Sequence, residues 1–305
     1  MSKQVEVEVD GRRLRLSNLD KVLYPATGFT KGEVIDYYTR IAPTVLPHLR
    51  NRPLTLKRYP DGVEAEHFYE KQAPRHAPEW VETARIPSGH TRPFIDFVLA
   101  NDRATLVWLA NLADLELHTS LSKASDVDTP TMVAFDLDPG APAALLECAQ
   151  VALLLRDMLD DLGLRCFAKT SGSKGIHLAV PLNVKASYER TKPFAQALAQ
   201  LLEKRHPDRV VSKMTKKLRE GKVLIDWSQN DAHKTTVCAY SLRARERPTV
   251  SAPLAWDEVE AASVAGDAGR LVFESHDVLE RVERHGDLFA PVAEVEQKLP
   301  KLPTA

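Results

Sequence analysis

The stretch Met132-Val-Ala-Phe-Asp-Leu-Asp-Pro139 sets the architecture of the chain, because it has the pattern of a buried strand that ends in two carboxylates. Asp136 and Asp138 are two residues apart, so an extended backbone projects both side chains from one face, while Leu137 points the other way. Adjacent carboxylates repel each other and stay ionised most easily around a divalent cation. The stretch therefore predicts a metal site at a strand end. In the alternative reading, one aspartate caps the following helix and the other lies in solvent.

A third carboxylate closes the segment Lys222-Val-Leu-Ile-Asp226. Asp226 follows three apolar residues, which is a costly position for an unpaired charge. Three carboxylates at strand ends suit a two-metal site, in which metal ions activate a 3′-hydroxyl and offset charge on a transferred phosphoryl group. The alternative for Asp226 is a plain strand end exposed to water.

The loop Thr170-Ser-Gly-Ser-Lys-Gly-Ile-His177 lies between two predicted strands. Its glycines let the backbone approach a ligand, successive N–H groups in such a turn bind anions, and Ser171 and Lys174 add donors. It is not a P-loop, because the spacing differs and a strand follows. The alternative is an ordinary tight turn with a solvated lysine. A lone histidine such as His177 is more often structural than catalytic.

The remaining pattern mixes helices and strands without repeats, which predicts an α+β fold with a catalytic sheet in the second half. Asp10-Gly11 predicts a hairpin, and Thr30 to Glu33 predict a capping box on a helix that Pro43 and Pro47 should kink or split. Further strands are predicted at residues 54–59, 94–99, 131–137, 165–170, 176–182, 222–227 and 235–242. Further helices are predicted at residues 102–113, from Pro142 to about Gly163, and from Ser187 to about Arg205.

Composition limits the class of protein. The 305 residues carry a net charge of -1, yet eight Lys or Arg residues lie between Lys204 and Lys222, either as a polyanion-binding face or as a solvated helix. No apolar run is long enough to span a membrane and no secretory signal opens the chain, so a cytoplasmic protein is expected. The three cysteines show no paired spacing and are expected to be reduced and structural.

These motifs appear in the order of the three motifs of archaeo-eukaryotic primases, and the chain resembles the polymerase domain of bacterial ligase D from about Leu16 to about Leu288. The specific stretches are Asp20-Lys-Val-Leu-Tyr-Pro25, Arg52-Pro-Leu-Thr-Leu-Lys-Arg58, Glu116-Leu-His118, Met214-Thr-Lys-Lys-Leu-Arg219, Asp226-Trp-Ser-Gln-Asn230, Lys234-Thr-Thr236 and Tyr240-Ser-Leu-Arg243. The resemblance implies a primase-like catalytic core, with an RRM-like mixed or antiparallel sheet and flanking helices, plus an N-terminal α/β subdomain.

The same resemblance implies a role for each site residue. Asp136, Asp138 and Asp226 would be catalytic and bind two divalent metal ions, with Mn²⁺ preferred and Mg²⁺ possible. The residues implied to bind the incoming NTP or dNTP are Lys57, Arg58, His118, Ser171, Lys174, His177, Arg219 and Arg243. Those implied to bind DNA are Lys21 and Lys31, at a 5′-phosphate, and Phe68 and Tyr69, by stacking. Lys57 and Arg58 are neighbours on a strand, so their side chains should point to opposite faces.

The implied activity is extension and gap filling at DNA ends, favouring ribonucleotides, in non-homologous end joining. The implied partners are DNA ends, gapped duplexes with a 5′-phosphate, Ku and an ATP-dependent DNA ligase. One primase-polymerase domain is expected over residues 1–295, with a DNA-end-binding part to about 125 and a catalytic part from 126, followed by a tail at 296–305. The ligase motif Lys-x-Asp-Gly is absent, so a stand-alone polymerase or an excised domain is expected.

Two other classes of function are open. A two-metal nuclease or phosphatase acting on DNA ends also uses paired carboxylates, but it needs no triphosphate pocket, so the loop with Arg219 and Arg243 favours the polymerase. A non-catalytic DNA-end-binding module would not need the three intact carboxylates.

Overall fold

The computed structural model describes residues 4–88 and 93–300 of the chain. The chain divides into two compact units. Unit 1 contains Met1–Ser125, Thr235–Ser251 and Phe273–Asp287, and unit 2 contains Asp126–Lys234, Ala252–Val272 and Leu288–Ala305. The expected division kept residues 126–295 together, whereas two later segments group with the N-terminal part instead.

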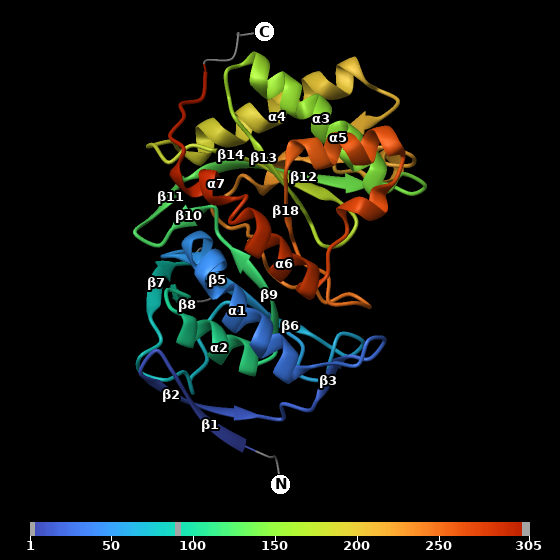
Figure 1. The fold of residues 1–305 in the computed structure, drawn as a ribbon. Coiled ribbons are helices and arrows are strands. Elements are labelled where there is room, and N and C mark those ends of the chain that lie inside the picture. Colours follow the sequence, from blue (N-terminus) through green and yellow to red (C-terminus); the bar gives the residue numbers. More distant parts are fainter. Residues whose placement is uncertain (1–3, 89–92, 301–305) are drawn as a thin grey trace. The chain divides into compact units, whose positions relative to one another are not determined.

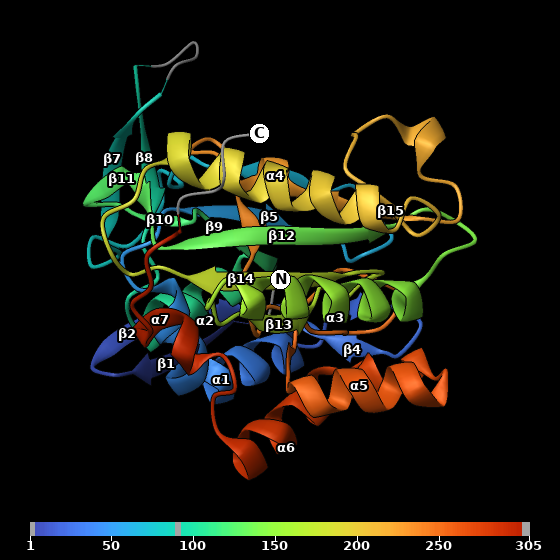
Figure 2. The same cartoon turned by 90° about the horizontal axis from the view of Figure 1, so that it is seen from above.

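Unit 2 is built on a six-stranded sheet with the strand order β15-β16-β12-β14-β13-β18. The strands are β12 (Met132–Pro139), β13 (Phe167–Thr170), β14 (Ile176–Pro181), β15 (Val210–Val211), β16 (Val223–Asp226) and β18 (Pro253–Leu254). All neighbours are antiparallel except β15 and β16. Figure 1 shows α3 (Leu145–Asp161) and α4 (Tyr188–Arg205) on one side of this sheet, and Figure 2 shows them from above.

The remaining elements of unit 2 are short. They are β11 (Asp126–Pro130), α5 (Trp256–Ala265), α7 (Ala290–Glu294), and the 3-10 helices η1 (Lys216–Leu218), η2 (Trp227–Gln229) and η3 (Ala268–Leu271). The core lies between the sheet and its helices, because Val133, Phe135 and Leu137 of β12 are fully buried. Strand alternation turns Asp136 and Asp138 to the opposite face.

Unit 1 has a four-stranded sheet with the order β17-β9-β5-β6. Its strands are β5 (Leu54–Arg58), β6 (Phe68–Glu70), β9 (Asp114–Thr119) and β17 (Thr236–Val237). Further strands are β1 (Gln4–Val9), β2 (Arg12–Ser17), β3 (Val22–Tyr24), β4 (Phe29–Thr30), β7 (Thr83–Pro87), β8 (Phe94–Val98) and β10 (Ser122–Lys123). The helices α1 (Lys31–Leu49), α2 (Arg103–Asn111) and α6 (Ser275–His285) complete the unit.

The local signals at the N-terminus are confirmed. Asp10 and Gly11 have φ angles of 49° and 76°, as a type I′ hairpin turn requires. The capping box at Thr30 and Glu33 is formed, and it opens α1. α1 is one helix through Pro43 and Pro47, so these prolines do not split it. Two other predictions were wrong. α3 begins at Leu145, after Pro142. Of the strand predicted at residues 235–242, only β17 forms, because Tyr240 adopts a left-handed φ of 65°.

The expected tail is ordered where the structure describes it. The backbone N–H of Gln297 donates to Leu182 at 2.9 Å, and Leu299 is buried. Arg190 also donates to the Leu299 carbonyl. Residues 296–300 therefore belong to the folded part of unit 2, while residues 301–305 lie outside the described residues. No helix within residues 4–88 and 93–300 is long and apolar enough to cross a bilayer.

Candidate active site

The three carboxylates predicted from the sequence share one face of the unit 2 sheet. Asp136 on β12 is the direct cross-strand partner of Asp226 on β16 in an antiparallel pair. Side chains at directly opposed positions point to the same face, and Asp138 joins them because it lies two residues farther along β12. The register of β12 against β16 thus brings a carboxylate from a distant segment beside the Asp-x-Asp pair.

Mutual repulsion is visible at Asp138. Desolvation and the charges of Asp136 and Asp226 raise the pKa of this carboxyl to about 6, while Arg219 opposes the shift. Carboxylates that repel in this way form the oxygen donor set that a divalent cation neutralises. The chemistry of the donor set therefore fits a metal ion.

The side chains are not gathered around an ion position. Within residues 4–88 and 93–300, no three His, Cys, Asp or Glu side chains are arranged to hold one. Asp226 gives a reason, because one carboxylate oxygen accepts from the Ser228 N–H at 2.8 Å and the other from the Gln229 amide at 2.9 Å. It caps η2 in this state. The oxygen that accepts from Gln229 keeps a lone pair, so it could bind a metal ion without losing this hydrogen bond.

A row of polar side chains crosses four strands of the sheet at Asp136. Lys169, His177, Asp136 and Asp226 are successive cross-strand partners on β13, β14, β12 and β16. The His177 Nε2 lies 3.1 Å from Asp136 Oδ1, and its Nδ1 lies 3.0 Å from the ammonium of buried Lys169. A carboxylate only accepts and an ammonium only donates, so the proton of neutral His177 sits on Nε2. His177 thereby orients Asp136.

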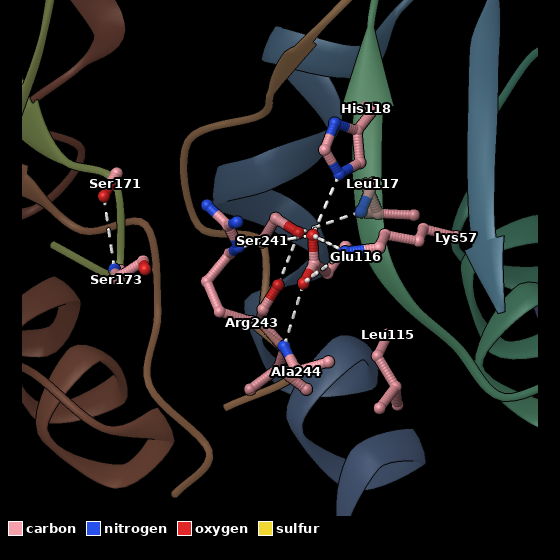
Figure 3. A network of polar contacts seen from close by, with 12 residues as sticks. Lys57, Leu115, Glu116, Leu117, His118, Ser171, Ser173, Ser241, Arg243 and Ala244 are labelled. Atoms are coloured by element: carbon pink, nitrogen blue, oxygen red, sulfur yellow. Dashed lines mark hydrogen bonds and ion pairs between the residues drawn. The ribbon is translucent and has the colours of Figure 1, made fainter. Parts of the chain in front are cut away.

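The loop between β13 and β14 is held by its own serine. The Ser171 hydroxyl accepts a hydrogen bond from the backbone N–H of Ser173 at 3.2 Å (Figure 3). It accepts a second one from the backbone N–H of Gly175 at 3.1 Å. Ser171 is buried, whereas Lys174 at the tip is exposed. Ser171 therefore shapes the loop, and Lys174 is the member whose charge reaches solvent.

Two glycines press segments against the end of β12. A Cβ added at Gly175 would lie 2.1 Å from the Leu137 carbonyl oxygen, and one added at Gly140 would lie 1.9 Å from the Arg219 carbonyl oxygen. Only residues without a side chain permit these approaches. They place the serine loop and the Arg219 segment directly beside Asp138, although loop, arginine and aspartate are far apart in the sequence.

The pKa of Asp138 leads to a stability prediction for Asp138→Asn. The native carboxyl, with a pKa of about 6, keeps a proton between about pH 4 and pH 6 that the unfolded chain has released, so wild-type stability falls as the pH rises through this window. The variant has no such carboxyl to ionise. Because Asp138 is also solvent-exposed, the metal-free variant should gain only about 1 kcal/mol at pH 7.5 and nothing at pH 4. Urea unfolding in a chelating buffer measures both values, and a variant less stable than wild type at pH 7.5 would contradict the repulsion.

In unit 1, a second group of the expected residues surrounds one buried carboxylate, Glu116 on β9 (Figure 3). The His118 Nε2 lies 3.0 Å from Oε2, the Arg243 Nε lies 3.3 Å from the same oxygen, and the Lys57 Nζ lies 3.4 Å from Oε1. Burial raises the pKa of Glu116, but the hydrogen bond from His118 and the charges of Arg243 and Lys57 outweigh it and hold this pKa well below its ordinary value. Glu116 is therefore ionised.

Arg58 points away from this group, as strand alternation predicts. Its guanidinium donates to Glu70 at 2.8 Å and to the Leu112 carbonyl at 3.1 Å, and it lies over the Phe68 ring at 5.1 Å. Phe68 and Tyr69 are 44% and 60% exposed on β6, an edge strand of the sheet. Exposed aromatic rings at an edge are available for stacking.

Lys21 and Lys31 lie in a cationic environment. Lys21 pairs with exposed Asp61 at 2.7 Å, and the Lys31 ammonium donates to the Ser17 carbonyl at 2.7 Å. Burial, together with the nearby positive charges of Lys21 and Arg58, lowers the pKa of Lys31 to about 8. Like charges in proximity are costly until an anion arrives.

Sequence reasoning missed two contributors. Glu116 belongs to the Glu116-Leu-His118 stretch, and strand alternation sends its side chain to the same face as His118. Lys169 lies inside an apolar strand, where a buried cation is itself unusual. Strand alternation at Glu116 and the lysine inside an apolar strand can both be found in the sequence. Neither feature shows which side chains the residue contacts.

A mixed sheet that gathers carboxylates on one face, beside a serine–glycine loop and an arginine, has the construction of a metal-dependent nucleotidyltransferase of the polymerase and primase type. The chain belongs to the LigD primase-polymerase family, since the family model described as "LigD, primase-polymerase domain" matches residues 30–289. The expected α+β fold, with its primase-like core, is confirmed by this match and by the structural comparison.

Solved and curated relatives agree with this assignment. The polymerase domain of Mycobacterium tuberculosis ligase D, solved in complex with DNA, matches with a TM-score of 0.85 and 39% identity over 93% of this chain and 99% of that chain. The multifunctional non-homologous end joining protein LigD of Mycolicibacterium smegmatis is 44% identical over 282 residues, which are 92% of this chain and 36% of that protein. The bifunctional LigD of Bacillus subtilis is 32% identical over 278 residues, covering 91% and 44%. The chain thus spans less than half the length of these two relatives.

Proposed function

We propose that this chain extends primer strands and fills gaps at DNA ends during non-homologous end joining, with a preference for ribonucleotides. The observation that carries the proposal is the single face of the unit 2 sheet that holds Asp136, Asp138 and Asp226, with the Ser171–Gly175 loop packed against the end of the same strand. Ku and an ATP-dependent DNA ligase are proposed partners, as the joining role requires, and the cytoplasm is the proposed location.

Divalent ions bound by Asp136, Asp138 and Asp226 would lower the pKa of the primer 3′-hydroxyl and offset charge on the transferred phosphoryl group. Two ions are proposed, with Mn²⁺ preferred over Mg²⁺. His177 keeps Asp136 oriented through its Nε2–H, so one oxygen of that carboxylate is already fixed before an ion binds. Asp226 would complete the donor set through the carboxylate oxygen that does not cap η2.

The incoming nucleotide is proposed to bind through Lys57, Arg58, His118, Ser171, Lys174, His177, Arg219 and Arg243. Arg219 offers the clearest support, because its buried Nε–H has no hydrogen-bond acceptor within the described residues. A buried donor without an acceptor is costly, and a phosphate oxygen would satisfy it. Arg58 is the weakest member, since its guanidinium is engaged by Glu70.

The test is a 5′-labelled primer on a gapped duplex, incubated with the protein, Mn²⁺ and ribonucleotides. Elongation of the primer is the expected result. Shortening would instead identify a two-metal nuclease, and a mobility shift without any change in primer length would identify a non-catalytic end-binding module. Repeating the reaction with deoxyribonucleotides and with Mg²⁺ measures the proposed sugar and metal preferences.

The charge cluster at Lys31 leads to a prediction about the 5′-phosphate. Lys21→Ala combined with Lys31→Ala should remove most of the preference for a gap that carries a 5′-phosphate, about a tenfold effect for two lost charge contacts. The measurement compares extension on gaps with and without the phosphate. The exposed lysines Lys123 and Lys185, replaced together by alanine, provide a charge-matched control. A preserved preference in the Lys21 and Lys31 variant would remove both residues from the proposed site.

The same cluster predicts a pH dependence. Lys31, with a pKa of about 8, is charged at pH 7 and loses its proton as the pH rises. A bound phosphate favours the charged form and moves this transition to higher pH. The phosphate preference of the wild type should therefore weaken between pH 8 and pH 10, whereas Lys31→Arg should retain it.

A further inference from the structure

Glu116 contacts three of the proposed nucleotide-binding residues, although it has no role of its own in the proposed function. Its side chain is only 1% exposed, and three basic side chains converge on it: Lys57, His118 and Arg243. One carboxylate oxygen also accepts from the backbone N–H of Ala244 at 3.1 Å. Glu116 therefore holds both the side chain of Arg243 and the backbone immediately after it.

The contacts fix each basic side chain in a different way. The Lys57 ammonium lies 5.3 Å from the centre of the Tyr59 ring and 5.4 Å from that of Tyr69, so two aromatic faces and one carboxylate restrain it. His118 must carry a proton on Nε2, because the carboxylate it faces can only accept. Long, flexible cations lose much rotamer freedom on binding a ligand, and a buried anchor removes that cost in advance.

The charge balance of this cluster calls for an anion. Lys57 and Arg243 contribute two positive charges against the one negative charge of Glu116. Burial lowers the pKa of His118, and although the bond to Glu116 opposes the shift, the net direction is downward, so His118 adds little charge at neutral pH. Lys57, Arg243 and Glu116 together carry one net positive charge, which favours a polyphosphate as the ligand of this cluster.

We infer that Glu116 is a positioning residue, which sets the places of Lys57, His118 and Arg243 so that they bind the phosphates of a nucleoside triphosphate. The inference rests on the proposed function. Glu116 does not touch the nucleotide in this account, since its two oxygens already accept from protein donors. It acts only through the residues that it holds.

Removing the charge of Glu116 distinguishes a positioning role from a purely electrostatic role, because the two roles predict opposite changes in the affinity for a triphosphate. Glu116→Gln makes the cluster more positive by one unit, so a purely electrostatic role predicts tighter binding of a triphosphate. A positioning role predicts weaker binding, because the amide places N–H donors against side chains that are themselves donors. The sign of the change in affinity therefore decides between them.

The experiment measures primer extension on a gapped duplex with Mn²⁺ at varied ATP, and ATP binding by calorimetry. For Glu116→Gln we expect the KM and the Kd for ATP to rise at least about tenfold, which corresponds to about 1.4 kcal/mol, with a smaller change in kcat. Glu116→Asp keeps the charge but withdraws the carboxylate by one methylene group, so an intermediate KM is expected. Thermal melting of each variant checks that it is folded.

The matched control is Asp287→Asn. Asp287 is a largely buried carboxylate of unit 1 that bonds to His48 at 2.8 Å and to Tyr240 at 2.7 Å. Its replacement should lower the melting temperature and leave the KM for ATP within about twofold. An unchanged or lower KM in folded Glu116→Gln overturns the inference. If Glu116→Gln does not fold, Glu116→Asp decides, and a wild-type KM there overturns it too. A wild-type protein that neither extends the primer nor binds ATP overturns the proposed function instead.

Discussion

Replacing Asp136 and Asp138 together by alanine is expected to lower primer extension at least about a thousandfold, equivalent to about 4 kcal/mol of transition-state stabilisation. The two carboxylates lie on one face of β12 opposite Asp226, and burial, with the charges of Asp136 and Asp226, raises the pKa of Asp138. Without them, Asp226 alone cannot hold the ions that neutralise the phosphoryl group. Steady-state extension of a labelled primer with Mn²⁺ and ribonucleotides gives the rate of each protein.

Binding of gapped duplex should survive the double substitution, because Lys21, Lys31 and the aromatic pair are untouched. The control replaces Asp160 and Asp161, two exposed aspartates at the end of α3, so that the same number of carboxylates is lost elsewhere. It should extend primers at the wild-type rate. Extension by the Asp136 and Asp138 variant at more than a tenth of that rate would contradict the metal assignment. Asp226→Ala tests the third ligand separately, and loss of the η2 cap should lower its melting temperature as well.

Gly175→Ala is expected to be the most damaging substitution outside the carboxylates. Its Cβ would approach the Leu137 carbonyl oxygen to 2.1 Å, a distance that real contacts do not reach. The serine loop must then move away from β12, which should destabilise unit 2 by about 2 kcal/mol. The displaced loop can no longer hold Ser171 and Lys174 in their native positions at the end of β12, so extension should fall about a hundredfold.

A second glycine separates steric contact from backbone strain. Gly163 has a left-handed φ of 71° but open space around the position of a Cβ, so Gly163→Ala should cost about 1 kcal/mol and leave extension unchanged. Urea unfolding and primer extension measure both proteins side by side. Equal effects of the two alanines on extension would show that the close approach of Gly175 to β12 has no functional importance.

The parts of the fold that depend on local pattern could be predicted from the sequence. Alternation along residues 132–139 placed the carboxylates on one face, and Asp10-Gly11 and Thr30 to Glu33 gave the hairpin and the start of α1. Alternation also separated Lys57 from Arg58. In each case the structure is determined by residues that are close together in the sequence.

The rest depends on long-range contacts that no local pattern encodes. The pairing of Asp136 with Asp226 joins segments ninety residues apart, and it follows from strand register rather than from either sequence. The strand predicted at residues 235–242 was wrong, because that segment makes its hydrogen bonds to scattered positions in unit 1 and not to one long neighbour. The role of Glu116 could not be predicted for the same reason, because its contact with Arg243 joins residues that are far apart in the sequence.

Unit 1 is built from three separated segments of the chain, and this has a consequence for folding during synthesis on the ribosome. Unit 1 includes Thr235–Ser251 and Phe273–Asp287, so its first 125 residues emerge long before the segments that complete it. Its central sheet then lacks β17, Glu116 lacks Arg243, and α1 lacks α6. Most of unit 2 is made in that interval. The first 125 residues must therefore remain incompletely folded until residue 287 has been translated. A nascent chain halted at residue 234 should be far more sensitive to protease in these 125 residues than the complete 305-residue chain.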